Sequence, residues 1–143
     1  MGQPVSYLWR GYGSAVFIEL GELTHRTKRD GSAGHPEGQV SCGVEWSWRI
    51  EDDTRVLCGS CSEEELWEPS FNRLRGARVG GLKQFGALPE IELSTDEGLR
   101  VLTFSTTEGQ PQWHLVDRRK NAAYWFSVRH GRLYLGDGTE PAN

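Results

Sequence analysis

The sequence predicts an α+β fold in which a mainly antiparallel, curved sheet of about eight strands packs against one bent helix. Apolar and polar residues alternate in many short segments of the 143-residue chain, which is the two-residue period of a strand with one buried face. Helical spacing occurs in residues 62–75. Eighteen glycines supply the tight turns that join consecutive strands into antiparallel pairs.

The central segment shows the change from helix to strand periodicity most clearly. Phe71 and Leu74 complete the helix, and Gly76 ends it. Apolar residues then recur at every second position, which predicts an antiparallel meander of four strands at residues 79–85, 88–94, 99–104 and 112–117. The link between the second and third strands ends in Gly98, which accepts the positive φ that a short hairpin loop requires.

The segments before the helix predict three more features. Residues 5–9 and 15–20 form an opening hairpin, whereas residues 21–38 lack an apolar period and collect Gly, Pro and charge, as in a mobile loop. Residues 40–50 show the most regular alternation in the chain, which predicts one long strand that turns back into residues 55–59.

The helix has a capping box at its start. The Ser62 hydroxyl is expected to accept a hydrogen bond from the third helical N–H, and Glu65 to bond back to the cap. Pro69 then bends the helix or starts its second part. The predicted buried stripe consists of Leu66, Trp67, Phe71 and Leu74.

The chain after the meander predicts a last hairpin at residues 124–128 and 132–135. Trp125, Leu133 and Leu135 are its expected core residues, and residues 136–143 form a frayed tail. The length fits a single domain that spans residues 1–143.

Charge and composition exclude several classes of partner. The net charge is −4, and the basic residues are scattered, so we expect no nucleic acid as partner. No apolar run is long enough to cross a bilayer and no secretory signal is visible, so we expect no membrane association and a cytoplasmic location. The odd number of cysteines, three, fits a reducing compartment.

Tryptophan provides the first candidate site. Trp46 and Trp48 fall on the same face of the predicted strand at residues 40–50, and Trp113 is expected to face inward from the fourth strand of the meander. The three rings could line a cup for a small molecule in a curved sheet. The alternative is that they form the core between the sheet and the helix.

Cysteine provides the second candidate site. Cys58 and Cys61 form a C-x-x-C pair between a predicted strand and the start of the helix, a position that suits a redox thiol. Together with Cys42 and one His they could also hold zinc. The alternative is that all three are buried free thiols with no cofactor.

The acidic start of the helix provides the third candidate site. Glu63, Glu64 and Glu68 form a cluster that could dock a basic protein, or they could be a cap and a solvated face.

The central segment resembles small uncharacterised bacterial proteins, some of which are similar to immunity proteins of toxin systems. The similarity covers about a third of the chain and consists of core positions, so it implies fold more than activity. The residues that carry it are Leu74, Gly76, Val79, Gly98, Leu99, Val101, Phe104, Trp113 and Leu115.

These observations together predict a non-enzymatic cytoplasmic protein, monomeric or homodimeric, that binds another protein through the acidic cluster. The partner implied by the resemblance is a toxin that this protein neutralises. A small-molecule domain with the tryptophan cup is the alternative, and a metal or redox protein built on the cysteines is a further one.

Overall fold

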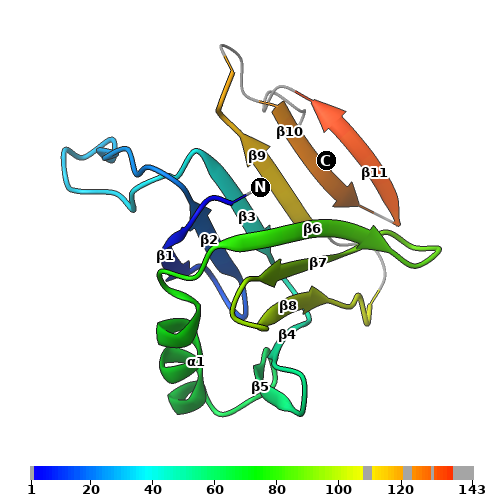
Figure 1. Ribbon diagram of the computed structural model, residues 1–143. Coiled ribbons are helices and arrows are strands. Elements are labelled where there is room, and N and C mark those ends of the chain that lie inside the picture. The colour runs from blue at the N-terminus through cyan, green and yellow to red at the C-terminus, as the bar shows by residue number, and fades with distance from the viewer. Residues whose placement is uncertain (1, 108–110, 121–123, 130, 137–143) are drawn as a thin grey trace.

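The chain folds into two antiparallel sheets and one short helix, which confirms the α+β class with a dominant sheet (Figure 1). The computed structural model describes residues 2–107, 111–120, 124–129 and 131–136. Eleven strands are present in these residues, where the sequence predicted about eight. Of the expected tail at residues 136–143, Gly136 is instead the last residue of a strand, and residues 137–143 lie outside the described part.

The first sheet has six strands in the order β1-β2-β3-β9-β10-β11. Every neighbouring pair in it is antiparallel. The strands are β1 (Val5–Arg10), β2 (Val16–Leu20), β3 (Val40–Val44), β9 (Pro111–Asp117), β10 (Tyr124–Arg129) and β11 (Arg132–Gly136). The predicted opening and closing hairpins are both confirmed.

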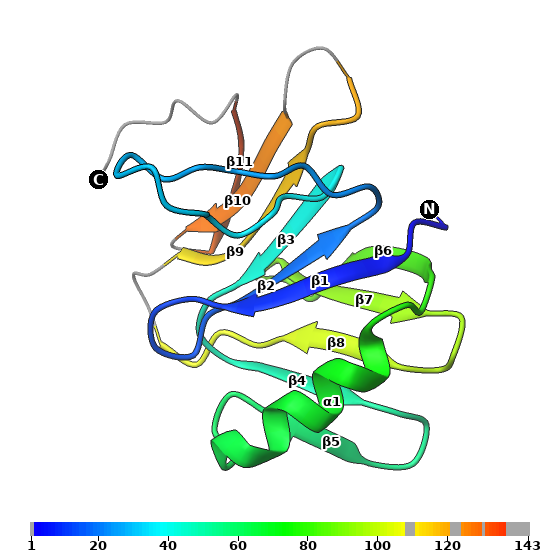
Figure 2. The ribbon, with the colours of Figure 1, turned by 90° about the vertical axis from the view of Figure 1, so that its left-hand side faces the viewer.

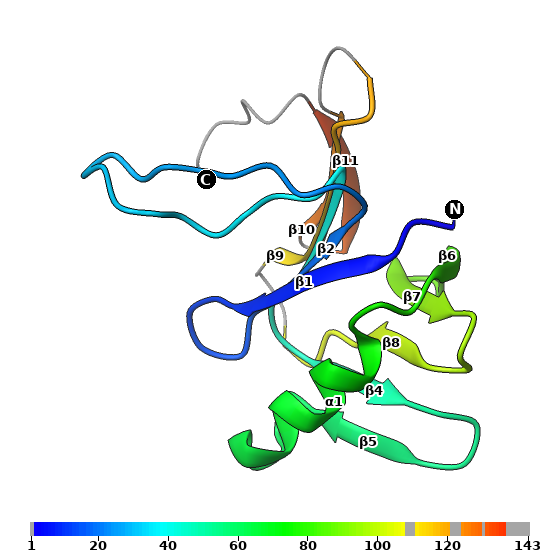
Figure 3. The ribbon, with the colours of Figure 1, turned by 60° about the vertical axis from the view of Figure 1, so that its left-hand side comes forward.

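The second sheet has five strands in the order β5-β4-β8-β7-β6 and is also antiparallel. Its strands are β4 (Trp48–Glu51), β5 (Val56–Gly59), β6 (Val79–Phe85), β7 (Glu90–Thr95) and β8 (Arg100–Thr103). Figure 3 shows this sheet on one side of the six-stranded sheet, so each sheet buries one face against the other.

Two predictions about strand neighbours are wrong. The single strand at residues 40–50 is two strands, β3 and β4, which belong to different sheets. The link between them is held by Ser14, whose hydroxyl lies 3.1 Å from the carbonyl of Glu45 and 2.8 Å from that of Trp46. Likewise β9 pairs with β3 and β10 and not with the meander, which therefore has three strands. Alternation reports which residues share a face, but it carries no information about which strand lies alongside.

The helical segment differs from the prediction at its start. A 3₁₀ turn, η1 (Glu64–Leu66), leads into α1 (Trp67–Leu74), with Pro69 in the first turn of α1. The capping box does not form, because the Ser62 hydroxyl instead accepts the Gly59 N–H at 2.8 Å and closes the turn after β5. Leu66, expected to be buried, is 47% exposed. The expected end at Gly76 is confirmed by its φ of 85°.

The core lies between the two sheets and under α1, which crosses β4 and β5 (Figure 2). Trp67, Phe71 and Leu74 of α1 are buried there, as predicted. The ring of Trp67 meets that of Trp48 edge to face at 5.0 Å between centroids.

Residues 21–38 form an irregular two-stranded arm that projects from the outer face of the six-stranded sheet (Figure 3). Thr24 and Glu37 exchange backbone hydrogen bonds along the arm at 2.7 and 2.9 Å. At its base the carboxylate of Glu19, buried in β2, accepts the Gly38 N–H at 3.0 Å. The arm also touches β1 through His35, whose ring stacks on that of Trp9 at 4.3 Å between centroids, so polar and aromatic contacts together hold it.

The outer face carries a row of aromatic rings that requires Gly43. Phe17 of β2 stacks on Trp9, with 4.0 Å between the ring centroids. His114 of β9 stacks on Trp125, with 5.2 Å between the ring centroids. Gly43 of β3 lies opposite Phe17 of β2 on one side and opposite His114 of β9 on the other. A Cβ at Gly43 would overlap the imidazole of His114.

We expect Gly43→Ala to lower the free energy of unfolding by about 1–3 kcal/mol, because His114 must leave its place between Phe17 and Trp125. Gly80→Ala in β6 is the matched control, since its added Cβ meets only atoms at 3.8 Å or more. The control should change the stability by less than about 0.5 kcal/mol. Urea denaturation measures the free energy of unfolding of both variants. Equal losses of stability in Gly43→Ala and Gly80→Ala would contradict the role given to Gly43.

Candidate functional site

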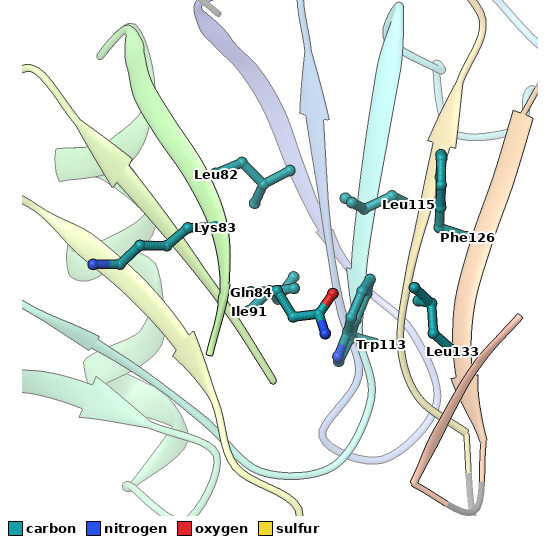
Figure 4. Close-up of a pocket in the computed structure, with 8 residues that line it drawn as sticks. All are labelled: Leu82, Lys83, Gln84, Ile91, Trp113, Leu115, Phe126 and Leu133. Atoms are coloured by element: carbon teal, nitrogen blue, oxygen red, sulfur yellow. The ribbon is translucent and has the colours of Figure 1, made fainter. Parts of the chain in front are cut away.

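The most distinctive surface feature is an apolar cleft of about 230 Å³ between the two sheets (Figure 4). Strands β6 and β7 form one wall, and β9, β10 and β11 form the other. Lys83 and Gln84 are the polar residues of its lining. The apolar lining consists of Leu82, Ile91, Trp113, Leu115, Phe126 and Leu133.

The cleft exists because the six-stranded sheet is wider than the sheet that covers it. Two apolar rows run across its inner face, one through Trp113, Val128 and Leu133 and the other through Leu115, Phe126 and Leu135. Trp113 and Val128 are buried, whereas Leu133 is 46% and Leu135 64% exposed. The five-stranded sheet ends at β6, so the β11 end of each row has no cover among the described residues.

The same geometry overturns the prediction that Leu133 and Leu135 are core residues. The alternation of apolar and polar residues in β11 does place both Leu133 and Leu135 on the inner face. A strand pattern, however, does not report how far the opposite layer extends.

Trp113 is the fixed wall of the cleft. Its ring is 3% exposed, and its Nε1 donates to the carbonyl of Pro89 at 3.0 Å, which ties β9 to the turn before β7. The indole N–H is therefore satisfied, and the ring offers an apolar surface. Lys83 is the titratable residue of the lining, and the apolar walls suit the binding of an apolar group.

The three tryptophans of the predicted cup lie in three different environments. Trp48 is 3% exposed in the core and donates its Nε1 to the carbonyl of Ser14 at 2.7 Å. Trp46 is 45% exposed on the link between β3 and β4. Trp113 lines the cleft, and neither of the other two does.

Sequence reasoning named Trp113 but missed the other cleft residues. Leu82, Leu115 and Phe126 are only partly buried, although each sits at an inward position of its strand. One feature of the sequence could have predicted the cleft. The predicted last hairpin has more inward-facing apolar residues than one short helix could cover.

The predicted acidic cluster is exposed, and two of its three members form ion pairs within the chain. Glu64 meets Arg10 at 2.9 Å, and Glu68 meets Arg75 at 2.7 Å. The Arg10 guanidinium also lies 4.3 Å from the ring centroid of Trp67. Glu63 precedes η1. The segment therefore presents mixed charge, which weakens its attraction for a basic partner.

The three cysteines lie in different places. Cys42 in β3 and Cys58 in β5 are buried in different sheets, and Cys61 is exposed. Within the part of the chain that the structure describes, no three His, Cys, Asp or Glu residues are grouped as a metal site. Burial, with the charge of Glu19, raises the pKa of the Cys42 thiol to about 12. Burial also raises the pKa of Cys58, and a hydrogen bond with Ser70 offsets part of that rise.

We expect one thiol to react rapidly with Ellman's reagent in the native protein, and all three in denaturant. The thiolate is the reacting species, so burial and a raised pKa both slow Cys42 and Cys58. Cys61→Ser should remove the rapid phase. Rapid reaction of two thiols in the native protein would show that the C-x-x-C pair is accessible as a unit.

Comparisons of the chain with protein-family models, with curated proteins and with solved structures found no match. No helix among the described residues has the length and apolar character that crossing a membrane requires.

Proposed function

We propose that this protein is a non-enzymatic protein-binding domain whose cleft receives apolar side chains of a partner polypeptide. The observation that carries the proposal is the apolar inner face of β9, β10 and β11, which continues past the edge of the covering sheet (Figure 4). Contiguous exposed apolar surface of this kind is typical of interaction sites.

The size of the cleft favours a side chain over a free small molecule. Its volume of about 230 Å³ lies below the roughly 300–1,000 Å³ of most ligand pockets. A Leu or Phe side chain of a partner would contact Trp113, Leu115 and Phe126, and flanking residues would cover Leu133 and Leu135. A few apolar anchors in a pocket commonly supply most of the binding energy of a protein interface.

We propose the cytoplasm as the location, on the charge and composition of the chain. A toxin as partner rests on the resemblance of the central segment alone. Glu64 lies in η1, Glu68 lies in α1, and Glu63 directly precedes η1. Figures 1 and 2 show α1 at the opposite end of the molecule from β11. We therefore propose the cleft, and not the acidic cluster, as the main contact.

Selection of random peptides displayed on phage against the immobilised protein tests the proposal. We expect the enriched peptides to share large apolar residues and to lose at least about tenfold in affinity for Gln84→Trp. Gln84 is exposed and extends toward Trp113 in the cleft, so a Trp there fills the space without removing core atoms (Figure 4).

The matched control is Val56→Lys, which changes an apolar residue of β5 that is 55% exposed and lies outside the cleft. This variant should bind the peptides as the parent protein does. A second variant, with the charges of Glu63, Glu64 and Glu68 reversed, should also bind them with unchanged affinity. No enrichment, or equal affinity for Gln84→Trp, would contradict the proposal. The small-molecule alternative predicts a different set of results. Decanoate would quench the tryptophan fluorescence saturably, Gln84→Trp would abolish this quenching, and no peptides would be enriched.

A further inference from the structure

We infer that β11 is a self-association edge, through which two copies of this chain pair antiparallel to form a two-fold symmetric dimer. This inference concerns the backbone edge of β11, although Leu133 of the same strand also lines the cleft. That strand ends the six-stranded sheet and pairs with β10 on one side. Its other side has no strand partner among the described residues.

The three other sheet edges are protected in recognisable ways. The segments that lead into β1 and β6 are joined by backbone hydrogen bonds, from the Gly2 N–H to the Val79 carbonyl and from the Val5 N–H to the Ala77 carbonyl, both 2.8 Å. β6 also has an irregular register near Gly81 and the exposed Lys83. β5 has only four residues and packs against α1. Short length, bulges, lysines and covering helices all discourage pairing with other chains.

β11 is also short, with five residues, but among the described residues no helix, bulge or lysine protects its central residues. Its sequence is Arg-Leu-Tyr-Leu-Gly, and Leu133, Tyr134 and Leu135 are 46%, 40% and 64% exposed. An exposed, uncharged, apolar edge strand is a ready template for another strand.

The sequence of β11 is self-complementary under a two-fold axis. Leu-Tyr-Leu reads the same in both directions, so an axis at Tyr134 places that residue opposite its own copy. Leu133 then lies opposite Leu135 of the second copy, on the inner face. Arg132 lies opposite Gly136 of the second copy, so the register brings no two charges of like sign together. Aromatic and aliphatic cross-strand pairs of this kind stabilise antiparallel sheets.

The contact is small, which sets its expected strength. A pair of five-residue strands lies at or below the low end of stable protein interfaces, so we expect a dissociation constant of roughly 10–100 µM. In a continuous sheet with this symmetry both inner faces point the same way, so the dimer would present two clefts on one side.

Sedimentation equilibrium over a range of concentrations tests the association. We expect the full chain to shift from monomer to dimer, and Leu135→Lys to weaken the association at least tenfold, because it places a charge against Leu133 of the second copy. Val56→Lys, at similar exposure on another edge, should dimerise as the parent does. A monomer at all concentrations up to about 0.5 mM, or equal effects of the two variants, would overturn the inference.

Disulfide trapping tests the register, in a Cys61→Ser background that removes the exposed native thiol. Directly opposite residues lie about 4.5–5.5 Å apart at Cα, within disulfide reach. Tyr134→Cys should therefore cross-link to itself. Leu133→Cys and Leu135→Cys should each stay monomeric alone and cross-link when mixed. Cross-linking of Leu133→Cys with itself and not with Leu135→Cys would exclude an axis at Tyr134.

Discussion

Replacing Phe71 with Ala is expected to lower the free energy of unfolding by about 3–5 kcal/mol, the largest effect of any single substitution considered. Phe71 is 1% exposed, and its ring packs against the touching pair Trp48 and Trp67, with 6.4 and 6.3 Å between ring centroids. It therefore joins α1 to β4, and its removal leaves a cavity that two large, fixed indoles cannot fill.

Urea denaturation at constant m-value measures this loss. The matched control is Leu66→Ala, five residues earlier in the same helical segment and 47% exposed, which should cost less than about 1 kcal/mol. Phe71→Leu keeps most of the volume and should fall between the two. A cost for Phe71→Ala no larger than that for Leu66→Ala would contradict the packing of α1 on the core.

Replacing Glu19 with Ala is expected to lower the free energy of unfolding by about 2–4 kcal/mol. Glu19 is 2% exposed, and its carboxylate accepts hydrogen bonds from Trp9 Nε1 and Gly38 N–H, both at 3.0 Å, and from the Ser41 hydroxyl. The variant removes the acceptor of the buried Gly38 and Ser41 donors and of the half-buried Trp9 donor. A buried donor without an acceptor costs more than its hydrogen bond contributes.

The same variant should loosen the arm at residues 21–38, because Glu19 joins its base to the sheet. Hydrogen exchange at the amide of Gly38 is expected to speed up by at least tenfold, since that amide loses its acceptor. Glu22→Ala, an exposed carboxylate just after β2, is the control and should change neither quantity appreciably. An unchanged exchange rate at Gly38 in Glu19→Ala would show that other contacts hold the arm.

The sequence predicted the local structure of this protein well, because local structure follows from local periodicity. The bounds of β6 match the expected 79–85, and the end of the helix at Gly76 and the hairpin at Gly98 depend on single residues with positive φ. These signals act within a few residues of chain, where steric preferences are decisive.

Long-range pairing could not be predicted in the same way. Nothing in the alternation of residues 40–50 indicates that the chain changes sheets after Val44, and the hydroxyl of Ser14 that holds the link comes from a distant turn. The capping pattern at Ser62 was likewise open to a competing partner, the Gly59 N–H.

The cleft escaped prediction for a related reason. Trp113, Leu115 and Phe126 have the pattern of core residues, and only the width of the opposite sheet decides which of them stay covered. Glu19 was hidden as well, because a carboxylate within a strand gives no sign of burial until Gly38 and Ser41 are brought beside it.

The most direct test of the proposed binding site is the NMR spectrum of the indole N–H groups during titration with a selected peptide. We predict that the signal of Trp113 shifts, because its ring forms the wall of the cleft, while those of Trp46 on the β3–β4 link and Trp48 in the core stay in place. Single Trp→Phe variants assign the three signals. A peptide that binds while shifting Trp46 or Trp48 and leaving Trp113 unchanged would contradict the cleft as the binding site.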